Sequence, residues 1–274
     1  MAQARRAKPP IAILTDFGYR DHYAGAIKGV IAAIAPGAQI IDITHGIPAQ
    51  SIVAGALALR ESWRYFPPKT IFLAVVDPGV GTARLPIAIE TRAGARLVGP
   101  DNGLLWLAAE DAGIARAVHI SSRRYRLETV SATFHGRDIF APAAAWLWRG
   151  APIGALGPRL AEIARLELPK PAVSGRQIRG EVIYVDGFGN LVTNIGREII
   201  ASLKATFPES RVWVRIDRGA AMEIRGTYGD APTGASVATF GSFELLEIAV
   251  RDGNAAERLK AGPGAPIIVT ASKK

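Results

Sequence analysis

The sequence predicts an α/β protein with a Rossmann-like N-terminal domain, built on a mostly parallel sheet, and a smaller C-terminal β-barrel domain. Three observations predict this fold class. Short apolar runs alternate with helical patterns up to residue 148, a stretch rich in glycine and proline follows, and short strands with little helix occupy the remainder. Such alternation is typical of a parallel sheet with crossover helices, and successive short strands are typical of a barrel or sandwich.

The N-terminal elements follow one another in a regular order. Residues 11–14 form a continuous apolar run, the pattern of a strand buried on both faces of a sheet. Small and apolar residues then recur at helical spacing over 23–34, until Pro36 and Gly37 stop the helix. The alternation continues with a strand at 39–43, a helix at 49–65, a strand at 70–76, paired strands at 87–91 and 96–98, and helices at 104–112 and 141–148.

The amino-acid composition of the chain changes after residue 148. Glycines and prolines recur from Gly150 to Pro158 and again at Pro169-Lys-Pro171, which indicates a linker. We expect the boundary within 165–178 and assign residues 1–170 to the first domain and 171–274 to the second. The second contains expected strands at 180–185, 211–216, 235–240, 245–250 and 267–270, with a tight turn between two strands over 186–194.

Composition excludes several classes of protein. Hydrophobic residues make up 49% and charged residues 21%, so the chain can bury an ordinary globular core. The absence of cysteine removes disulfides, thiolate catalysis, iron–sulfur clusters and cysteine-ligated zinc, and it favours a cytoplasmic location. No secretory leader is expected, because Thr15 and Asp16 cut the first apolar run at once. The longest apolar run, 139–148, is too short to span a bilayer, so no membrane partner is expected.

The net charge of +9 raises the question of an anionic partner. The tightest basic run within the body of the chain, Arg123-Arg124-Tyr125-Arg126, is short and lacks the interleaved aromatic residues of a stacking platform. We interpret it as a solvated surface patch and expect no nucleic-acid partner.

Polar residues gather in the loops that follow the predicted parallel strands. The carboxyl ends of such strands meet at one edge of the sheet, where ligands bind. Three acids, two histidines and two arginines are therefore expected on one rim: Asp16, Asp42, Asp77, His45, His135, Arg84 and Arg137.

Each of these residues has a structural reading beside the functional one. Asp16 suits a ribose diol, or an N-cap or turn. His135 suits a water-handling role or a satisfied structural histidine, and His45 suits a water-handling role or the turn at the start of a helix. Gly79-Val-Gly81-Thr-Ala-Arg84 lacks the third glycine of a dinucleotide loop. No H-x-x-x-H or H-E-x-x-H spacing occurs, so no metal site is expected.

Two segments of the second domain also carry polar and aromatic groups. In 186–194, Phe188 and Asn190 can stack on a flat base and bond to its edge, or simply pin a hairpin. The run from Gly241 to Val250 indicates a strand with polar residues at its mouth.

Several motifs in matching order resemble one family. They are Leu14-Thr-Asp-Phe-Gly18, Asp42-Ile-Thr-His45, Val76-Asp-Pro-Gly-Val-Gly-Thr82 with Arg84, Gly99-Pro-Asp-Asn-Gly103, Thr133-Phe-His-Gly-Arg-Asp138, Asp186-Gly-Phe-Gly-Asn190 with Thr193-Asn194, and Leu246-Glu-Ile-Ala249 with Gly253-Asn-Ala-Ala256. Together, over about residues 11–260, they resemble the S-adenosyl-L-methionine (SAM) hydrolases, also called SAM hydroxide adenosyltransferases, which are relatives of fluorinase and chlorinase.

The resemblance implies a reaction, an assembly and a set of site residues. The implied reaction converts SAM and water to adenosine and L-methionine without a cofactor, in a homotrimer whose sites lie at subunit interfaces. The implied residues are Asp77, Arg84 and His135 for the attacking water, and Asp16 for the ribose. Substrate-binding positions also include Phe17, Thr133, Phe188, Asn190, Ser242, Glu247 and Val250, with Phe188 as an aromatic wall against the base.

Water is favoured over halide as the nucleophile. The halogenases line their halide pocket with hydroxyl groups, whereas the corresponding positions here look like Val80 and Gly136, and the carboxylate of Asp77 would repel an anion. The insertion typical of fluorinases is also missing between Leu85 and Thr133. A SAM-dependent halogenase, an adenosine-binding sensor without turnover and a basic RNA-binding protein remain the alternatives.

Overall fold

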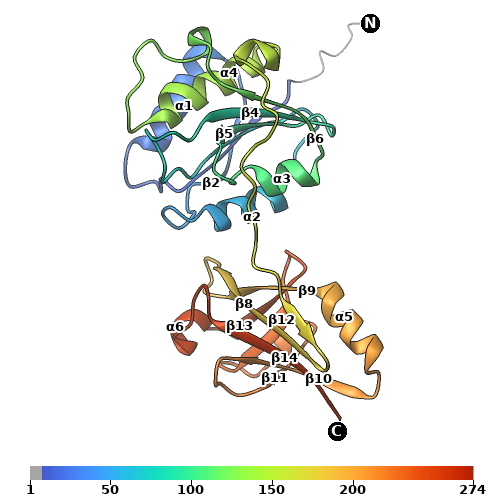
Figure 1. The fold of residues 1–274 in the computed structure, drawn as a ribbon. Coiled ribbons are helices and arrows are strands. Elements are labelled where there is room, and N and C mark those ends of the chain that lie inside the picture. The colour runs from blue at the N-terminus through green and yellow to red at the C-terminus, as the bar shows by residue number, and fades with distance from the viewer. Residues whose placement is uncertain (1–7, 274) are drawn as a thin grey trace, which may run out of the picture. The chain divides into compact units, whose positions relative to one another are not determined.

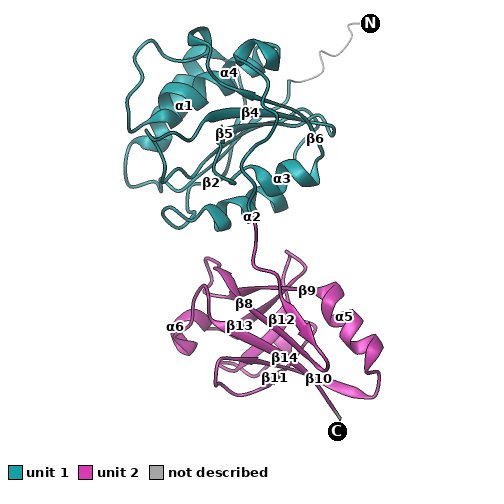
Figure 2. Cartoon of the chain, viewed as in Figure 1, with its two compact units in different colours: residues 1–166 teal, residues 167–274 magenta. Residues whose placement is uncertain are grey.

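The computed structural model describes residues 8–273 and divides the chain into two compact units, Met1–Leu166 and Glu167–Lys274 (Figures 1 and 2). Each unit has its own core of buried apolar side chains. Residues 150–158, expected to belong to a linker, are part of the first unit instead, because Ile153 and Leu156 are buried in its core. No helix among residues 8–273 has the length and apolar character needed to cross a membrane.

The first unit is built on a six-stranded sheet of order β2-β1-β3-β5-β4-β6. Strand β1 pairs in parallel with β2 and β3, and β3 with β5, whereas β4 runs antiparallel to both β5 and β6. The sheet is therefore mostly parallel, as predicted. Its strands are β1 Ile11–Thr15, β2 Ile40–Thr44, β3 Ile71–Val75, β4 Pro86–Thr91, β5 Arg96–Pro100 and β6 Ile114–His119.

Helices cover both faces of this sheet, with α1 and α4 on one face and α2 and α3 on the other (Figure 1). Their bounds are α1 Tyr23–Ile34, α2 Ile52–Trp63, α3 Trp106–Asp111 and α4 Ala141–Trp148. The two helices predicted at 23–34 and 141–148 are confirmed. Helix α2 begins at the N-cap Ser51, whose hydroxyl accepts a hydrogen bond from the Ala54 amide.

The central strands β1 and β3 are the buried support of the loops that follow them. Every residue of β1 and of β3 is buried, and all are apolar except Thr15 at the end of β1, as a sheet covered on both faces requires. The largest fully buried side chains in this unit include Phe72 and Phe140. Removing such a side chain typically costs about 3–5 kcal/mol. The loops that follow β1 and β3 are therefore attached to fully buried strands.

The second unit is a nearly closed, barrel-like antiparallel sheet of order β11-β10-β14-β8-β9-β13-β12, with β7 paired to β8 beside this path. Its two end strands approach each other where the amide of Arg225 donates to the carbonyl of Ala238, at 2.8 Å. The elements are β7 Ala172–Ser174, β8 Gln177–Val185, β9 Leu191–Gly196, α5 Arg197–Thr206, β10 Ser210–Ile216, β11 Met222–Glu223, β12 Ser236–Phe240, β13 Leu245–Val250, α6 Ala255–Leu259 and β14 Pro266–Lys273.

Candidate active site

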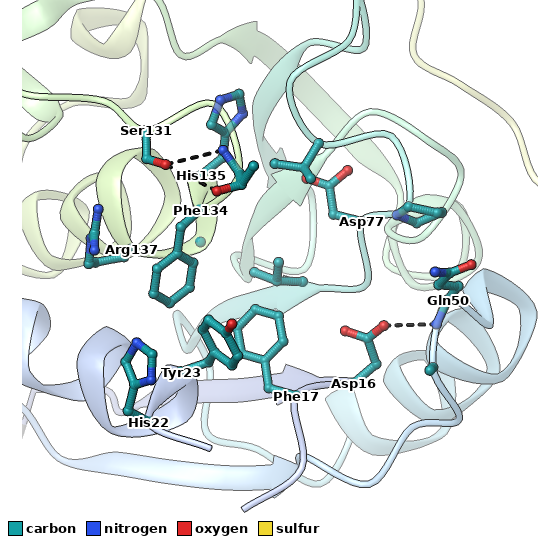
Figure 3. A pocket seen from close by; sticks show the side chains of 16 residues that line it. Asp16, Phe17, His22, Tyr23, Gln50, Asp77, Ser131, Phe134, His135 and Arg137 are labelled. Carbon is teal, nitrogen blue, oxygen red and sulfur yellow. Dashed lines mark hydrogen bonds between the residues drawn. The ribbon is translucent and has the colours of Figure 1, made fainter. Parts of the chain in front are cut away.

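A cavity of about 660 Å³ opens at the carboxyl ends of β1 and β3 (Figure 3). The loops after these strands supply Asp16 and Asp77, and the segment before α4 supplies His135. The lining residues are Asp16, Phe17, His22, Tyr23, Ala49, Gln50, Val75, Asp77, Pro78, Val80, Ser131, Thr133, Phe134, His135, Gly136 and Arg137.

Asp16 stands directly after β1 and is held by one backbone group. Its Oδ2 accepts a hydrogen bond from the amide of Gln50, at 2.8 Å (Figure 3). Gln50 has a positive φ of 65°, which is uncommon outside glycine. That backbone conformation directs the amide at the carboxylate and leaves the other oxygen, Oδ1, without a partner among the interactions of the described residues.

Asp77, Arg84 and His135 form one hydrogen-bonded cluster. The guanidinium of Arg84 grips the carboxylate of Asp77 with two bonds, Nε to Oδ1 at 2.9 Å and Nη2 to Oδ2. The same Nη2 lies 2.8 Å from Nδ1 of His135. Because the side chains of Arg84 and Asp77 are only 8% and 7% exposed, this pair is screened weakly by solvent.

The contact with Arg84 decides where His135 carries its proton. A guanidinium has donors and no acceptor, so Nδ1 of His135 is the acceptor and the neutral ring holds its proton on Nε2. Burial, and secondly the positive charge of Arg84, lower the pKa of His135 from its ordinary value. The ring is therefore neutral near pH 7 and presents a donor at Nε2.

The loop that carries Thr133 is fixed by the residues around it. Ser131 Oγ accepts from the amide of Thr133 at 3.2 Å, and the Ser131 amide donates to Asp138 at 2.8 Å. Asp138 is fully buried and paired with Arg137, so it supports the loop from below and does not line the cavity. Residues 136–140 form a π-helical turn that leads into α4, an irregularity that the sequence pattern did not predict.

An aromatic wall faces the two carboxylates. The ring of Phe134 meets Tyr23 and Phe17 edge to face, with centroids 5.1 and 5.9 Å apart (Figure 3). Sequence reasoning missed Tyr23, His22, Gln50 and Ser131 as lining residues. The signal for Tyr23 was available, since it begins the helix that follows the Asp16 loop.

The expectation that all seven charged residues share one rim is wrong in part. Asp16, Asp77, His135 and Arg137 line the cavity, and Arg84 contacts Asp77 and His135 from behind. Asp42 and His45 do not line it; His45 is 1% exposed and bonds to the hydroxyl of Thr15. A position at the carboxyl end of a strand places a residue at that edge of the sheet, but it does not determine the direction of its side chain.

The remaining predicted residues lie in the second unit. Phe188 is 82% exposed at the tip of a turn, while Asn190, Glu247 and Val250 are buried and Ser242 is exposed. Asp186 organises this turn, because its carboxylate accepts from the amides of Phe188 and Asn190 and from the side-chain amide of Asn190.

Glu247 is bonded inside its own unit. Its Oε1 accepts the hydroxyl proton of Tyr228, a residue that sequence reasoning missed. Burial raises the pKa of Glu247, and burial together with this bond raises the pKa of Tyr228. Within residues 8–273 no group of three or more histidine, aspartate and glutamate side chains has the arrangement of a metal site.

Comparisons with known proteins place the chain. Residues 11–157 match the family model of the SAM hydroxide adenosyltransferase N-terminal domain, and residues 180–268 match that of its C-terminal domain. The chain is 39% identical to a Thermus thermophilus protein named (R)-S-adenosyl-L-methionine hydrolase, over 94% of this chain and 98% of that one. It is 29% identical to a Nocardia brasiliensis fluorinase, over 91% and 92% of the two chains.

A solved structure agrees with these matches. A conserved protein from Thermotoga maritima, described as uncharacterized, superposes with a TM-score of 0.86 and 40% identity, over 95% of this chain and 99% of that chain. Both family models and these relatives cover the two units in the same order. The chain therefore belongs to the SAM hydroxide adenosyltransferase family.

Proposed function

We propose that this protein hydrolyses SAM to adenosine and L-methionine by attack of water at C5′ of the ribose. The observation that carries the proposal is the Asp77–Arg84–His135 cluster, which lies at the cavity that also contains the Asp16 carboxylate. The names of the relatives support the same reaction.

The leaving group of this reaction needs no proton from the protein. The oxygen of water forms a bond to C5′, the C5′–S bond breaks with its electron pair moving to sulfur, and the sulfonium leaves as the neutral thioether of methionine. One proton must leave the attacking oxygen. Catalysis then reduces to aligning the water, excluding other solvent and accepting that proton.

The three clustered residues supply these functions in the proposed mechanism. Asp77 accepts one proton of the water in a hydrogen bond, because each of its oxygens keeps a lone pair beyond those bound by Arg84. His135 donates from Nε2 to one lone pair of the water oxygen, which leaves the other lone pair for C5′. A protonated alcohol is a far stronger acid than a carboxylic acid, so Asp77 takes the proton after attack, and His135 orients the water without acting as its base.

The other predicted residues have binding roles in this proposal. Asp16 accepts hydrogen bonds from the ribose diol, and Phe17 and Thr133 line the cavity beside it. The adenosine positions, proposed from the family resemblance, are Phe188, Asn190, Ser242, Glu247 and Val250. No cofactor takes part, since SAM is the substrate.

We also propose a homotrimer in which a neighbouring chain completes each site. Phe188 supports this assembly, because a phenyl ring that is 82% exposed on a hydrogen-bonded turn is suited to covering the base of a ligand. We propose that the first unit is Rossmann-like, and that its mostly parallel sheet binds the ligand at the carboxyl ends of its strands.

The relatives' names specify one configuration at sulfur, and we propose that the (R) sulfonium epimer is a substrate here. The test incubates the purified protein separately with each SAM epimer and separates adenosine and methionine by chromatography. We expect both products in equal amounts from the (R) epimer. A yield no greater than that of heat-denatured protein would refute hydrolysis.

Product analysis at high chloride and a binding measurement separate the alternatives. Formation of 5′-chloroadenosine at high chloride would indicate a halogenase. Tight adenosine binding in calorimetry without product formation would indicate a sensor. The Asp77 carboxylate at the cavity argues against a bound halide, because two anions in a weakly screened site repel each other.

A further inference from the structure

A buried network of side chains lies behind the Asp16 loop, outside the cavity lining. His45, which is 1% exposed, places Nδ1 2.7 Å from the hydroxyl of Thr15 and Nε2 3.3 Å from Oδ1 of Asp42. The other oxygen of Asp42 accepts from the hydroxyl of Tyr19 at 3.0 Å and from the ammonium of Lys28 at 2.6 Å. One imidazole thus joins a carboxylate to a hydroxyl.

The groups on either side of the ring determine which nitrogen carries the proton. Burial would raise the pKa of Asp42, but the bonds from Lys28 and Tyr19 hold it below its ordinary value, so Asp42 is a carboxylate that only accepts. Burial lowers the pKa of His45, which is neutral. Its proton therefore lies on Nε2, where the Asp42 carboxylate 3.3 Å away attracts it although the two atoms do not meet in hydrogen-bond geometry, and Nδ1 accepts the hydroxyl proton of Thr15.

Thr15 and His45 also bond to the backbone around Asp16. With its proton committed to His45, the Thr15 oxygen offers its lone pairs and accepts from the amide of Phe17, at 3.2 Å. The carbonyl of His45 accepts from the amide of Gly18, at 2.7 Å. The residues on both sides of Asp16 are thereby tied to one histidine.

We propose that His45 is a positioning residue that holds the Asp16 carboxylate in place for the ribose diol of the substrate. The inference rests on the proposed function, which gives Asp16 that role. Among residues 8–273, one hydrogen bond, from the Gln50 amide, reaches the carboxylate itself, so the direction of its free oxygen depends on the backbone of the loop. His45 contacts this loop twice, through Nδ1 to Thr15 and through its carbonyl to Gly18, and the Asp42 carboxylate orients its ring.

The test compares two ligands that differ only in the diol. Calorimetry measures the Kd of adenosine and of 2′,3′-dideoxyadenosine for the wild type and for His45→Phe and Thr15→Val, which keep the size of the side chains and remove the polar contacts. We expect the wild-type preference for adenosine to shrink about tenfold in each variant, the equivalent of one charge-assisted hydrogen bond. We also expect KM for SAM to rise while kcat changes less than about threefold.

A matched control separates positioning from loss of stability. Thr91 is a buried threonine whose hydroxyl bonds to the Ala95 carbonyl in the β4–β5 turn, away from the cavity lining. Thr91→Val removes a comparable bond and should leave the ligand preference unchanged. Thr15→Ser keeps the hydroxyl and should restore most of the preference, and the double variant His45→Phe/Thr15→Val should be no worse than either single one.

Several results overturn the proposal. One is an unchanged preference for adenosine in folded His45→Phe or Thr15→Val. Another is an equal loss of preference in Thr91→Val. A third is a double variant in which the two single effects add. If His45→Phe does not fold, Thr15→Val decides the question. A wild type that prefers adenosine but releases none from SAM refutes hydrolysis and leaves this inference standing, whereas a wild type without that preference refutes the inference alone.

Discussion

Arg84 can donate hydrogen bonds and cannot accept them, and this property of one side chain governs the chemistry of its two neighbours. It leaves the free lone pairs of Asp77 as acceptors, for water in the proposed mechanism, and forces His135 to keep its proton on Nε2. Protonation of His135 would put an N–H against the guanidinium and break the cluster. The pH at which this occurs is therefore a property that kinetics can measure.

We predict that kcat rises with pH through an acid limb below 6.5 and is level above it. The pKa of His135 is lowered from 6.5 by burial and by Arg84, so the neutral, active form of the ring persists to lower pH than for a free histidine. Steady-state measurements of kcat at pH values on both sides of 6.5 locate the limb, and the pH profile of His135→Ala should lack it. A limb above pH 6.5, or a rate that falls as pH rises toward neutrality, would contradict the assigned tautomer.

Substitutions of the two carboxylates at the cavity should have different effects on kcat and KM. Asp77→Asn replaces an acceptor of the water's proton with an amide, and we expect kcat to fall roughly 10²–10⁴-fold with a smaller change in KM. Asp16→Ala should mainly raise KM, because it removes binding of the diol. Saturation kinetics of both variants provide the comparison. Near-normal kcat in Asp77→Asn would show that alignment and solvent exclusion suffice without a proton acceptor.

At the scale of single residues, the sequence predicted which loops carry polar groups but not where each side chain points. Asp77, Arg84 and His135 do lie within hydrogen-bonding distance. His45 was expected beside them, yet its ring turns inward to Thr15, a contact across thirty positions of sequence that no local pattern encodes.

At the scale of elements, one glycine controls how closely two loops approach. Gly81, between Asp77 and Arg84, has φ +77°, and a Cβ there would lie 2.5 Å from the carbonyl oxygen of Ala132. Ala132 belongs to the segment that leads to His135. The Arg84–His135 bond therefore depends on the absence of a side chain at residue 81.

Gly81→Ala should lower both stability and kcat. We expect it to cost about 3 kcal/mol of unfolding free energy, since the clash is with backbone and adds to the cost of a positive φ. Gly37→Ala is the control, because Gly37 has φ +87° and open space around the added Cβ. It should cost about 1 kcal/mol and leave kcat unchanged. Chemical denaturation and rate measurements check both variants, and equal effects at the two glycines would contradict the account.

Strong periodic patterns were predictive and weak ones were not. The helix at 23–34 was predicted correctly because its apolar residues repeat over three turns. Strand β6 was missed because it is an edge strand with exposed Ala115 and Arg116. Helix α5 was missed because its ten residues bury only Ile200 and Leu203 against the barrel-like sheet, so tertiary contacts stabilise it more than its own pattern predicts.

At the scale of the whole molecule, the proposed trimer is open to direct measurement. Light scattering should give about three times the chain mass of 29.0 kDa. Phe188→Ala removes an exposed ring that packs against little in its own unit, so it should raise KM and leave the unfolding midpoint nearly unchanged. A monomer with full activity would contradict a site completed by a neighbouring chain.

The central claim is that the oxygen of water becomes the 5′ oxygen of adenosine, and isotope labelling tests it most directly. The protein is incubated with (R)-SAM in water labelled with heavy oxygen, and the products are analysed by mass spectrometry. The account predicts one labelled oxygen in adenosine, at the 5′ position, and none in methionine. Adenosine without label, or label on the methionine side, would show that the bond from C5′ to sulfur is not broken by water.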